Sequence, residues 1–295
     1  MPFHISQEIY PFAGKYFPLG NLQYHYLDEG SGEPIVMVHG NPSWSIYYRN
    51  LVKGLRSSYR CIVPDHIGCG FSDKPDDLSY RYTLQQRIDD LERLIESLHL
   101  NNITLVVHDW GGFIGMGYAV RHPDKIKRIV VLNTGAFHLP QTKQLPLVLK
   151  FCRDSSLATF LIRGFNAFAI GTTWIGCTRK PMSRAIRQAF CAPYNSWANR
   201  IAISRFVQDI PLQSGDPSYA TLTQIQNRLQ LLQAVPMLIC WGEQDFVFDR
   251  HFLQEWCQRF PAAYVHKFSY GGHYVLEDAA DEILKLVQEF LQAHG

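Results

Sequence analysis

The chain has 295 residues, of which 46% are hydrophobic and 13% aromatic, so it can bury the core of one large α/β domain and does not require two independent domains. Its 28 basic and 26 acidic side chains give a formal net charge of +2, and no basic stripe runs along the sequence. These features exclude a nucleic-acid footprint, and we expect no nucleic acid among the partners of the protein.

Short apolar stretches recur along the chain and predict the strands of a sheet. Residues 22–27 alternate as in a half-exposed strand, whereas residues 35–38 form a continuous apolar run, which is typical of a strand buried on both faces. Further strands are predicted at 61–64, 103–107, 128–133, 236–241 and 264–268.

Stretches with helical spacing separate most of these strands. Thr83 and Gln86 have the form of a capping box, and apolar residues recur at helical spacing from Leu84 to Leu98. Helices are also predicted at about 45–55, at 113–120, at 218–232 and near the end of the chain from 283 onward. This alternation predicts a mainly parallel sheet flanked by helices, with functional groups at the carboxyl ends of the strands.

The alternation fails between the strands at 128–133 and 236–241. Residues 137–215 contain several amphipathic or aromatic segments and no convincing strand. We therefore predict a helical cap at 137–215, inserted into a core that consists of residues 1–136 and 216–295. Some cap aromatics either line an apolar substrate cavity or belong to a hydrophobic core. They are Phe165, Phe168, Trp174, Trp197 and Phe206.

A strand, a tight turn and a helix follow one another within residues 103–120, and the turn contains Asp109. This resembles a nucleophile elbow, Gly-x-Ser-x-Gly, in which a sharp turn lifts one side chain clear of the end of a parallel sheet. Val107 replaces the first glycine and Gly111 keeps the second, so the nucleophile position holds a carboxylate. The structural alternative for Asp109 is a helix cap.

Two further residues occupy the positions of an acid and a base. Asp245 follows the strand at 236–241, and His273 follows a Gly-Gly turn before the closing helix. The order nucleophile, acid, histidine is the one that α/β-hydrolases use. We therefore predict a catalytic triad of Asp109, Asp245 and His273, with His273 as general base and Asp245 as the residue that orients it. Glu243 and Asp249 are alternatives to Asp245.

A carboxylate nucleophile indicates a different reaction from that of a serine. It can displace a leaving group from a saturated carbon and form an alkyl ester, which water activated by the histidine then hydrolyses. Asn41 and Trp110 carry N–H donors that can bind a departing anion such as a halide. Their structural alternatives are a helix cap for Asn41 and packing under the cap for Trp110.

The cysteines and the N-terminus bear on the compartment. The seven cysteines are scattered, and no Cys-x-x-Cys pair predicts zinc or a redox motif. The N-terminus lacks the basic start and apolar core of an export signal, and no apolar run approaches the roughly 18 residues that span a bilayer. We therefore expect a cytoplasmic protein with reduced thiols and no membrane span.

Several motifs carry a resemblance to the haloalkane dehalogenase family of α/β-hydrolases. They are His-Gly-Asn-Pro at 39–42, Asp-His-Ile-Gly at 65–68 with Ser-Asp-Lys-Pro at 72–75, Val-His-Asp-Trp-Gly-Gly at 107–112, Trp-Gly-Glu-Gln-Asp at 241–245 and Gly-His at 272–273. The resemblance implies an α/β-hydrolase fold with a helical cap, and a haloalkane dehalogenase-type hydrolase without cofactor or metal. It implies the same triad roles for Asp109, Asp245 and His273, and a halide clamp of Asn41 and Trp110.

The cap resembles one branch of this family. Residues 137–140, 165–169, 192–200 and 206–212 are similar to the third dehalogenase subfamily, and equally to the β-lactone decarboxylases of bacterial long-chain olefin biosynthesis. The first resemblance implies that an alkyl halide becomes an alcohol through an ester of Asp109. The second implies that a cis-3-alkyl-4-alkyloxetan-2-one becomes a long-chain cis-alkene and CO2. The sequence motifs do not distinguish between these two reactions.

Two other functions are alternatives. Epoxide hydrolases also use an aspartate nucleophile, but they protonate the oxygen with cap tyrosines, for which Tyr194 and Tyr219 are the candidates. A non-catalytic binding protein on this fold conflicts with the filled catalytic positions. As partners we expect a small apolar substrate, water and halide. The decarboxylase interpretation adds long alkyl chains, and a homo-oligomer or an assembly with olefin-pathway enzymes.

Overall fold

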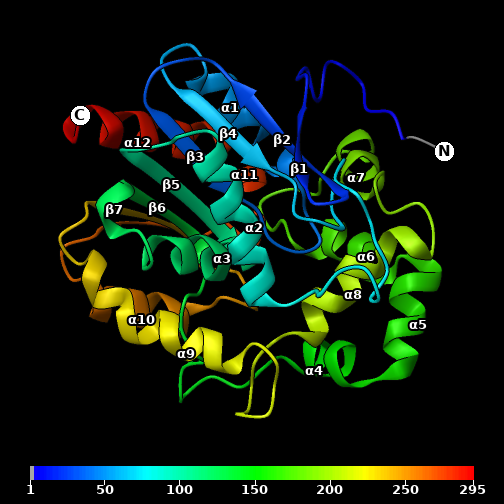
Figure 1. Cartoon of the computed structure of the whole chain (residues 1–295). Coiled ribbons are helices and arrows are strands. Elements are labelled where there is room, and N and C mark those ends of the chain that lie inside the picture. The colour runs from blue at the N-terminus through cyan, green and yellow to red at the C-terminus, as the bar shows by residue number, and fades with distance from the viewer. Residues whose placement is uncertain (1–2) are drawn as a thin grey trace.

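The computed structural model describes residues 3–295, within which eight strands form one sheet (Figure 1). The strand order is β1-β2-β4-β3-β5-β6-β7-β8; the pairs β1–β2 and β2–β4 are antiparallel, and the other neighbours are parallel. The predicted mainly parallel sheet is confirmed, and β1 is an additional strand at its antiparallel edge. The bounds are β1 (Lys15–Leu19), β2 (Leu22–Glu29), β3 (Pro34–Val38), β4 (Arg60–Pro64), β5 (Ile103–Asp109), β6 (Ile126–Thr134), β7 (Met237–Gly242) and β8 (Tyr264–Phe268).

Helices cover both faces of the sheet because side chains alternate along each buried strand. On β5, Val106 belongs to the apolar cluster of one face, while Leu105 and Val107 belong to that of the other. The Val106 face packs against α1 (Arg49–Leu55), α11 (Val275–Asp278) and α12 (Ala280–Ala293). The opposite face packs against α2 (Leu84–Ser97), α3 (Trp110–Ala119), α9 (Tyr219–Arg228) and α10 (Arg250–Arg259).

The predicted core helices differ from the observed ones mainly in their ends, and α10 and α11 are additional helices that were not predicted. Thr83 caps α2 as predicted, since its hydroxyl accepts the N–H of Gln86 at 3.3 Å. The predicted helix at 45–55 begins with a 3-10 turn, η1 (Ser45–Tyr48), and the one at 218–232 ends with another, η4 (Leu229–Leu232). A further 3-10 turn, η2 (Pro123–Lys125), leads into β6. No helix in the described part of the chain is long and apolar enough to cross a membrane.

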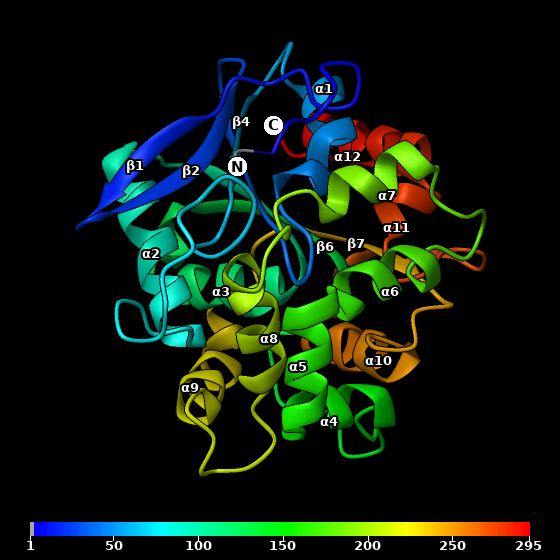
Figure 2. The same ribbon diagram turned by 90° about the vertical axis from the view of Figure 1, so that its right-hand side faces the viewer.

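The chain builds a separate group of helices between β6 and α9. They are α4 (Leu147–Asp154), α5 (Ser156–Phe165), α6 (Ala167–Ile175), α7 (Arg184–Cys191) and α8 (Ile201–Gln208), with a 3-10 turn, η3 (Ala198–Arg200), before α8. None of residues 137–215 belongs to a strand. These helices lie to the right of the sheet in Figure 1 and face the viewer in Figure 2. The name cap is kept for 137–215, and its boundaries stay a prediction.

Candidate active site

The turn between β5 and α3 raises Asp109 beyond the carboxyl edge of the sheet. Asp109 has φ = 50° and ψ = −126°, a left-handed conformation that residues other than glycine rarely adopt. The following helix begins close to β3, because a Cβ atom on Gly111 would lie 1.8 Å from the carbonyl oxygen of Val38. The strained residue and the required glycine are the features that the elbow pattern predicts at these two positions.

The loop after β3 fixes the carboxylate of Asp109. The backbone N–H of Asn41 donates to Oδ1 of Asp109 at 2.5 Å. A Cβ atom on Gly40 would lie 2.0 Å from the same oxygen, so a side chain at this position would displace the carboxylate. On the opposite side, the hydroxyl of Thr134 donates to the backbone carbonyl of Asp109. Oδ1 is therefore held by the protein, and Oδ2 is the oxygen that lies nearer to His273.

The structure brings Asp245 and His273 to the same edge of the sheet. Nδ1 of His273 lies 2.9 Å from Oδ2 of Asp245, and its Nε2 lies 3.8 Å from Oδ2 of Asp109. The first distance is a hydrogen bond and the second is too long for one. Val247 donates its backbone N–H to the other oxygen of Asp245 at 2.8 Å, and Nε2 of His108 donates to the carbonyl of His273 at 2.8 Å. The imidazole is thus oriented toward Asp109, and the catalytic roles of the three residues stay predictions.

Burial and charge act in opposite directions on these groups. Burial raises the pKa of Asp109 to about 6, although the nearby His273 and the backbone N–H groups of Trp110 and Asn41 lower it. Burial lowers the pKa of His273, but the charges of Asp245 and Asp109 outweigh it and leave the pKa above its usual value. Asp109 is therefore ionised at pH 7 but poorly solvated, a state that favours nucleophilic attack.

The two predicted anion donors line the same cavity as Asp109 and His273. The ring of Trp110 packs against Phe113 and Phe206, with both ring centroids 5.4 Å away. The side-chain nitrogen of Asn41 donates to the carbonyl of Ile203 in α8 at 3.2 Å, which uses one of its two hydrogens. Both side chains are thus positioned by residues around them, and their role toward an anion stays a prediction.

A buried arginine behind Trp110 was not among the predicted site residues. Arg87 in α2 is fully buried, and its guanidinium carbon lies 3.7 Å from the ring centroid of Phe206 and 5.8 Å from that of Trp110. Its Nη1 donates to Asp209 at 3.2 Å, while Nε and Nη2 have no partner among the described residues. The signal for it in the sequence is a charged residue on the apolar face of α2, between Leu84 and Ile88.

The cavity above Asp109 has a volume of about 330 Å³ and almost entirely apolar walls. Cap residues form one wall and residues after β7 another; representative lining residues are Leu149, Ile162, Phe168, Phe246 and Phe248. Of the five cap aromatics considered in the sequence, Phe168 lines the cavity and Phe206 is buried behind it. The other three are exposed, so they belong neither to the cavity nor to a core. Those three are Phe165, Trp174 and Trp197.

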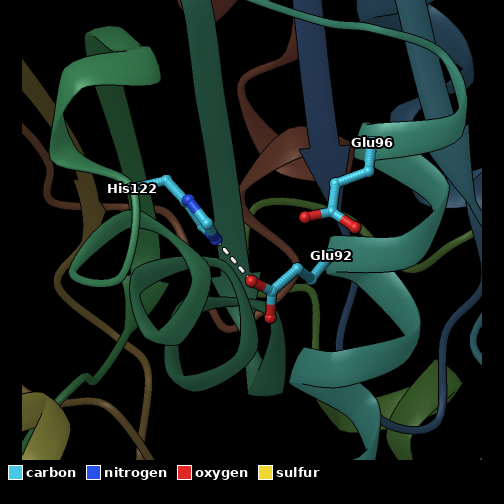
Figure 3. A group of neighbouring side chains, drawn as sticks. All are labelled: Glu92, Glu96 and His122. Atoms are coloured by element: carbon cyan, nitrogen blue, oxygen red, sulfur yellow. Dashed lines mark hydrogen bonds and ion pairs between the residues drawn. The ribbon is translucent and has the colours of Figure 1, made fainter.

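One group with metal-ligand side chains lies away from this cavity (Figure 3). Glu92 and Glu96 project from consecutive turns of α2 toward His122, and none of the three lines the cavity. Glu92 forms ion pairs with His122 and Arg121, and Arg121 also pairs with Asp89. The group therefore already has a positive partner. This group lies outside the catalytic site, so it does not bear on the prediction that the catalytic site holds no metal.

Comparison with known proteins gives relatives along nearly the whole chain. The α/β hydrolase fold family matches residues 33–158. The chain is 59% identical to a cis-3-alkyl-4-alkyloxetan-2-one decarboxylase of Shewanella oneidensis, over 95% of this chain and 89% of that protein. It is 47% identical to the enzyme of the same name from Xanthomonas campestris pv. campestris, over 90% and 91% of the two chains.

Proteins named haloalkane dehalogenase are also similar. The chain is 28% identical to haloalkane dehalogenase 2 of Mycobacterium tuberculosis, over 97% of this chain and 98% of that protein. The crystal structure of the haloalkane dehalogenase DatA from Agrobacterium tumefaciens C58 superposes with a TM-score of 0.86 at 24% identity, covering 96% and 97% of the two chains. The latter likeness supports the fold alone.

Proposed function

Since the chain belongs to the α/β-hydrolase family that contains the haloalkane dehalogenases and the cis-3-alkyl-4-alkyloxetan-2-one decarboxylases, we propose that it decarboxylates a β-lactone with two alkyl substituents. The prediction of an enzyme of this family is confirmed, and its relatives carry the names of both predicted reactions. The higher identity to the decarboxylases favours that reaction. The structural observation that supports it is the carboxylate of Asp109 in a cavity with apolar walls.

In the first proposed step, Asp109 attacks the ring carbon that carries the lactone oxygen. A bond forms between Oδ2 of Asp109 and this carbon, C4, while the C4–O bond of the ring breaks. The electron pair stays on the ring oxygen, which becomes part of a free carboxylate. The product is an alkyl ester of Asp109 with a carboxylate on the neighbouring carbon, C3.

In the second step, the ester collapses without water. The bond between C3 and the carboxylate carbon breaks, CO2 leaves, and the electron pair forms the C3=C4 double bond. At the same time the C4–O bond to Asp109 breaks and restores its carboxylate. Because the attack inverts C4, the new C4–O bond lies anti to the bond that releases CO2. Elimination in this arrangement keeps both alkyl groups on one side, so the alkene is cis.

Haloalkane dehalogenation is the second candidate, and the donors Asn41 and Trp110 on the cavity wall favour it. In this reaction the carboxylate of Asp109 displaces a halide from a saturated carbon, and the two donors bind the anion. Water activated by His273 then hydrolyses the ester at its carbonyl carbon. The two candidates share the first intermediate type and differ in whether His273 must act as a base.

The testing experiment supplies the purified protein with each substrate separately. With a cis-β-lactone that carries two long alkyl chains, the assay measures the alkene formed. With 1-bromobutane, it measures the bromide released. We expect rapid alkene formation and slow bromide release. Rapid bromide release with an inert lactone would replace the proposal with dehalogenation. An Asp109→Asn variant is the control, and it loses both reactions if they use the same nucleophile.

A His273→Phe variant tests the second step. With an alkyl halide, the ester on Asp109 has no base to activate water, so the mass of the protein increases by the alkyl group. With the lactone, collapse needs no base, and we expect alkene to form and no adduct to accumulate. An adduct that persists with the lactone would contradict the proposed collapse and indicate hydrolysis instead.

The surroundings of the reaction complete the proposal. We propose that the reaction needs no cofactor and takes place in the cytoplasm, where reduced thiols are favoured. The seven cysteines are all unpaired, as such a compartment requires. A long-chain β-lactone must be made by another enzyme, so a homo-oligomer or an assembly with lactone-forming enzymes stays part of the proposal.

A further inference from the structure

The cap exposes large apolar side chains on its outer surface. Eleven of the 17 large hydrophobic residues that are exposed in the described chain lie within 137–215. Four of the eleven, Val148, Phe151, Leu161 and Ile175, also line the cavity. The other seven do not, and we call them the cap patch. They are Leu147, Leu157, Phe160, Phe165, Ile170, Trp174 and Trp197.

The cap patch extends over three helices and the loop before α8. On α5, Leu157, Phe160 and Phe165 point outward at helical spacing, whereas Ala158 and Ile162 are buried, so this helix is apolar on both faces. The ring centroids of Phe160 lie 5.8 Å from Phe165 and 6.1 Å from Trp197, which joins α5 to the loop. Figure 2 shows α4, α5 and α6 on the face toward the viewer. Exposed apolar side chains that gather on one group of helices in this way indicate an interaction site.

The cap is also strongly basic. Residues 137–215 contain ten Lys and Arg but only two Asp and no Glu, a net charge of +8, so the rest of the chain carries −6. Six of these cations have no carboxylate partner among the described residues: Lys150, Arg163, Lys180, Arg184, Arg187 and Arg200. The remaining four pair with acidic residues. Lys150, Lys180 and Arg184 are exposed, whereas the other three are half-buried, and the guanidinium of Arg200 donates to backbone carbonyls.

Two of these cations lie directly on tryptophans of the patch. The guanidinium carbon of Arg187 is 3.8 Å from the ring centroid of Trp174, and that of Arg163 is 4.7 Å from the ring centroid of Trp197. Exposed tryptophan beside arginine suits the boundary between water and a bilayer, where the ring enters the lipid headgroup region and the cation binds lipid phosphate.

We propose that the cap patch docks the protein peripherally on an anionic lipid bilayer. The apolar side chains enter the interfacial region. The exposed cations Lys150, Lys180 and Arg184, together with the two arginines on the tryptophans, bind anionic headgroups. The charge favours lipid over a second copy of the chain, since two caps of net charge +8 repel each other. The cavity and the patch share α4, α5 and α6, so the proposed membrane contact lies on the same helices that line the cavity.

The test measures partition of the full chain onto lipid vesicles by flotation. Phosphatidylcholine vesicles with and without phosphatidylglycerol are compared, at low and high salt. We expect binding to the vesicles that contain phosphatidylglycerol, weakened by salt and much reduced on phosphatidylcholine alone. No partition onto anionic vesicles, or equal partition onto both kinds, would overturn the proposal. Binding does not depend on turnover, so this test is separate from that of the reaction.

Substitutions then locate the surface. A Phe165→Glu, Trp174→Glu double variant should partition at least about tenfold less onto the anionic vesicles. The matched control is Leu78→Glu, since Leu78 is 96% exposed but lies outside the cap; its partition should stay within about twofold of the wild type. Because all three positions are exposed, circular dichroism should show unchanged folding. An equal loss in the control contradicts a cap-specific surface.

A charge-reversal variant tests the contribution of the basic side chains to membrane binding. Lys150→Glu with Arg184→Glu should lower partition onto anionic vesicles by at least about tenfold, at roughly fivefold per charge removed. Sedimentation velocity of the same proteins tests the alternative that a second copy of the chain covers the cap patch. A wild-type dimer that the Phe165→Glu, Trp174→Glu variant dissociates, without vesicle binding by the wild type, would assign the patch to a second copy and overturn docking on lipid.

Discussion

The floor of the cavity and its cap wall are built from different kinds of contact. On the floor, Asp109, Asp245 and His273 each lie at a strand end and have defined hydrogen-bond partners. On the cap wall, side chains such as Leu149 and Phe168 offer no polar group to a ligand. In the proposed reaction, the floor determines which bonds are broken, and the wall determines which molecules fit. Substitutions in the two regions should differ in size accordingly.

The strongest test of the floor removes its proposed nucleophile, Asp109. Asp109→Asn should lower turnover by at least about 10⁴-fold, because an amide is too weak a nucleophile to form the ester. The same change should raise the free energy of unfolding by about 2–3 kcal/mol at pH 7, since burial disfavours the charge of Asp109. Steady-state kinetics and chemical denaturation measure the two effects. Residual turnover above this level would remove Asp109 from the proposed mechanism.

The stability difference between wild type and Asp109→Asn has a defined pH range. Asp109 has a pKa of about 6 in the folded protein and about 4 when unfolded, so the folded state binds more protons between these values. The contribution of Asp109 to stability is therefore fully present below about pH 4 and is lost as the pH rises through about 6. The two proteins should differ little near pH 4, and a constant difference across this range would contradict the assigned pKa.

A change at the boundary between floor and cap should have the next largest effect. Arg87 in α2 pairs with Asp209 after α8, and both are buried. Arg87→Met leaves Asp209 without its cation, so we expect the free energy of unfolding to fall by about 3 kcal/mol. Urea denaturation measures it. Arg121→Met is the control, since the half-buried Arg121 also pairs with carboxylates of α2, Asp89 and Glu92. A loss below about 1 kcal/mol would show that the pair does not join the two regions.

The pH dependence of turnover addresses the floor alone. The attack requires ionised Asp109, whose pKa is about 6. Below this value the carboxyl is protonated, and kcat/KM should fall about tenfold per pH unit. The profile is measured at constant ionic strength over the range in which the fold is intact. A rate that stays constant down to pH 5 would indicate that Asp109 is ionised at lower pH than its burial implies.

A change in the wall should have the smallest effect. Phe168→Ala removes part of the apolar lining and leaves the floor intact, so kcat/KM should change by less than about tenfold, with preference shifted toward bulkier alkyl chains. Tyr16→Ala is the control, since Tyr16 is an exposed aromatic residue outside the cap. The measurement is kcat/KM for a series of chain lengths. A loss as large as that of Asp109→Asn would erase the contrast between floor and wall.

The floor of the cavity could be predicted from the sequence better than the cap. The elbow at Asp109 was predictable because a strand, a glycine-supported turn and a helix are adjacent in the chain. Asp245 and His273 were predictable from strand ends and chain order. The contact between the Asn41 backbone and Asp109 was not, since the two residues are 68 positions apart and nothing local specifies it. The family, the fold and the enzyme class are confirmed; the individual roles stay predictions.

The cap was less predictable for a physical reason. Helical spacing locates an apolar face, but α5 has apolar residues on both faces, so spacing could not tell which face is inward. Phe165 and Phe168 are three positions apart; the first is exposed and the second lines the cavity. Arg87 shows the converse, because a charged side chain in an apolar stripe is buried only through its distant partners Asp209 and Phe206.

The insertion of the cap between β6 and β7 has a consequence during synthesis. β6 ends at Thr134 and its neighbour β7 begins at Met237, so the cap must be translated before β6 gains its second partner. At about 5–20 residues per second, the ribosome needs roughly 5–20 s for this segment. During this time one edge of the apolar strand β6 has no partner strand, and it can pair with other nascent chains. The insertion therefore lengthens the time for which this edge is unpaired on the growing chain.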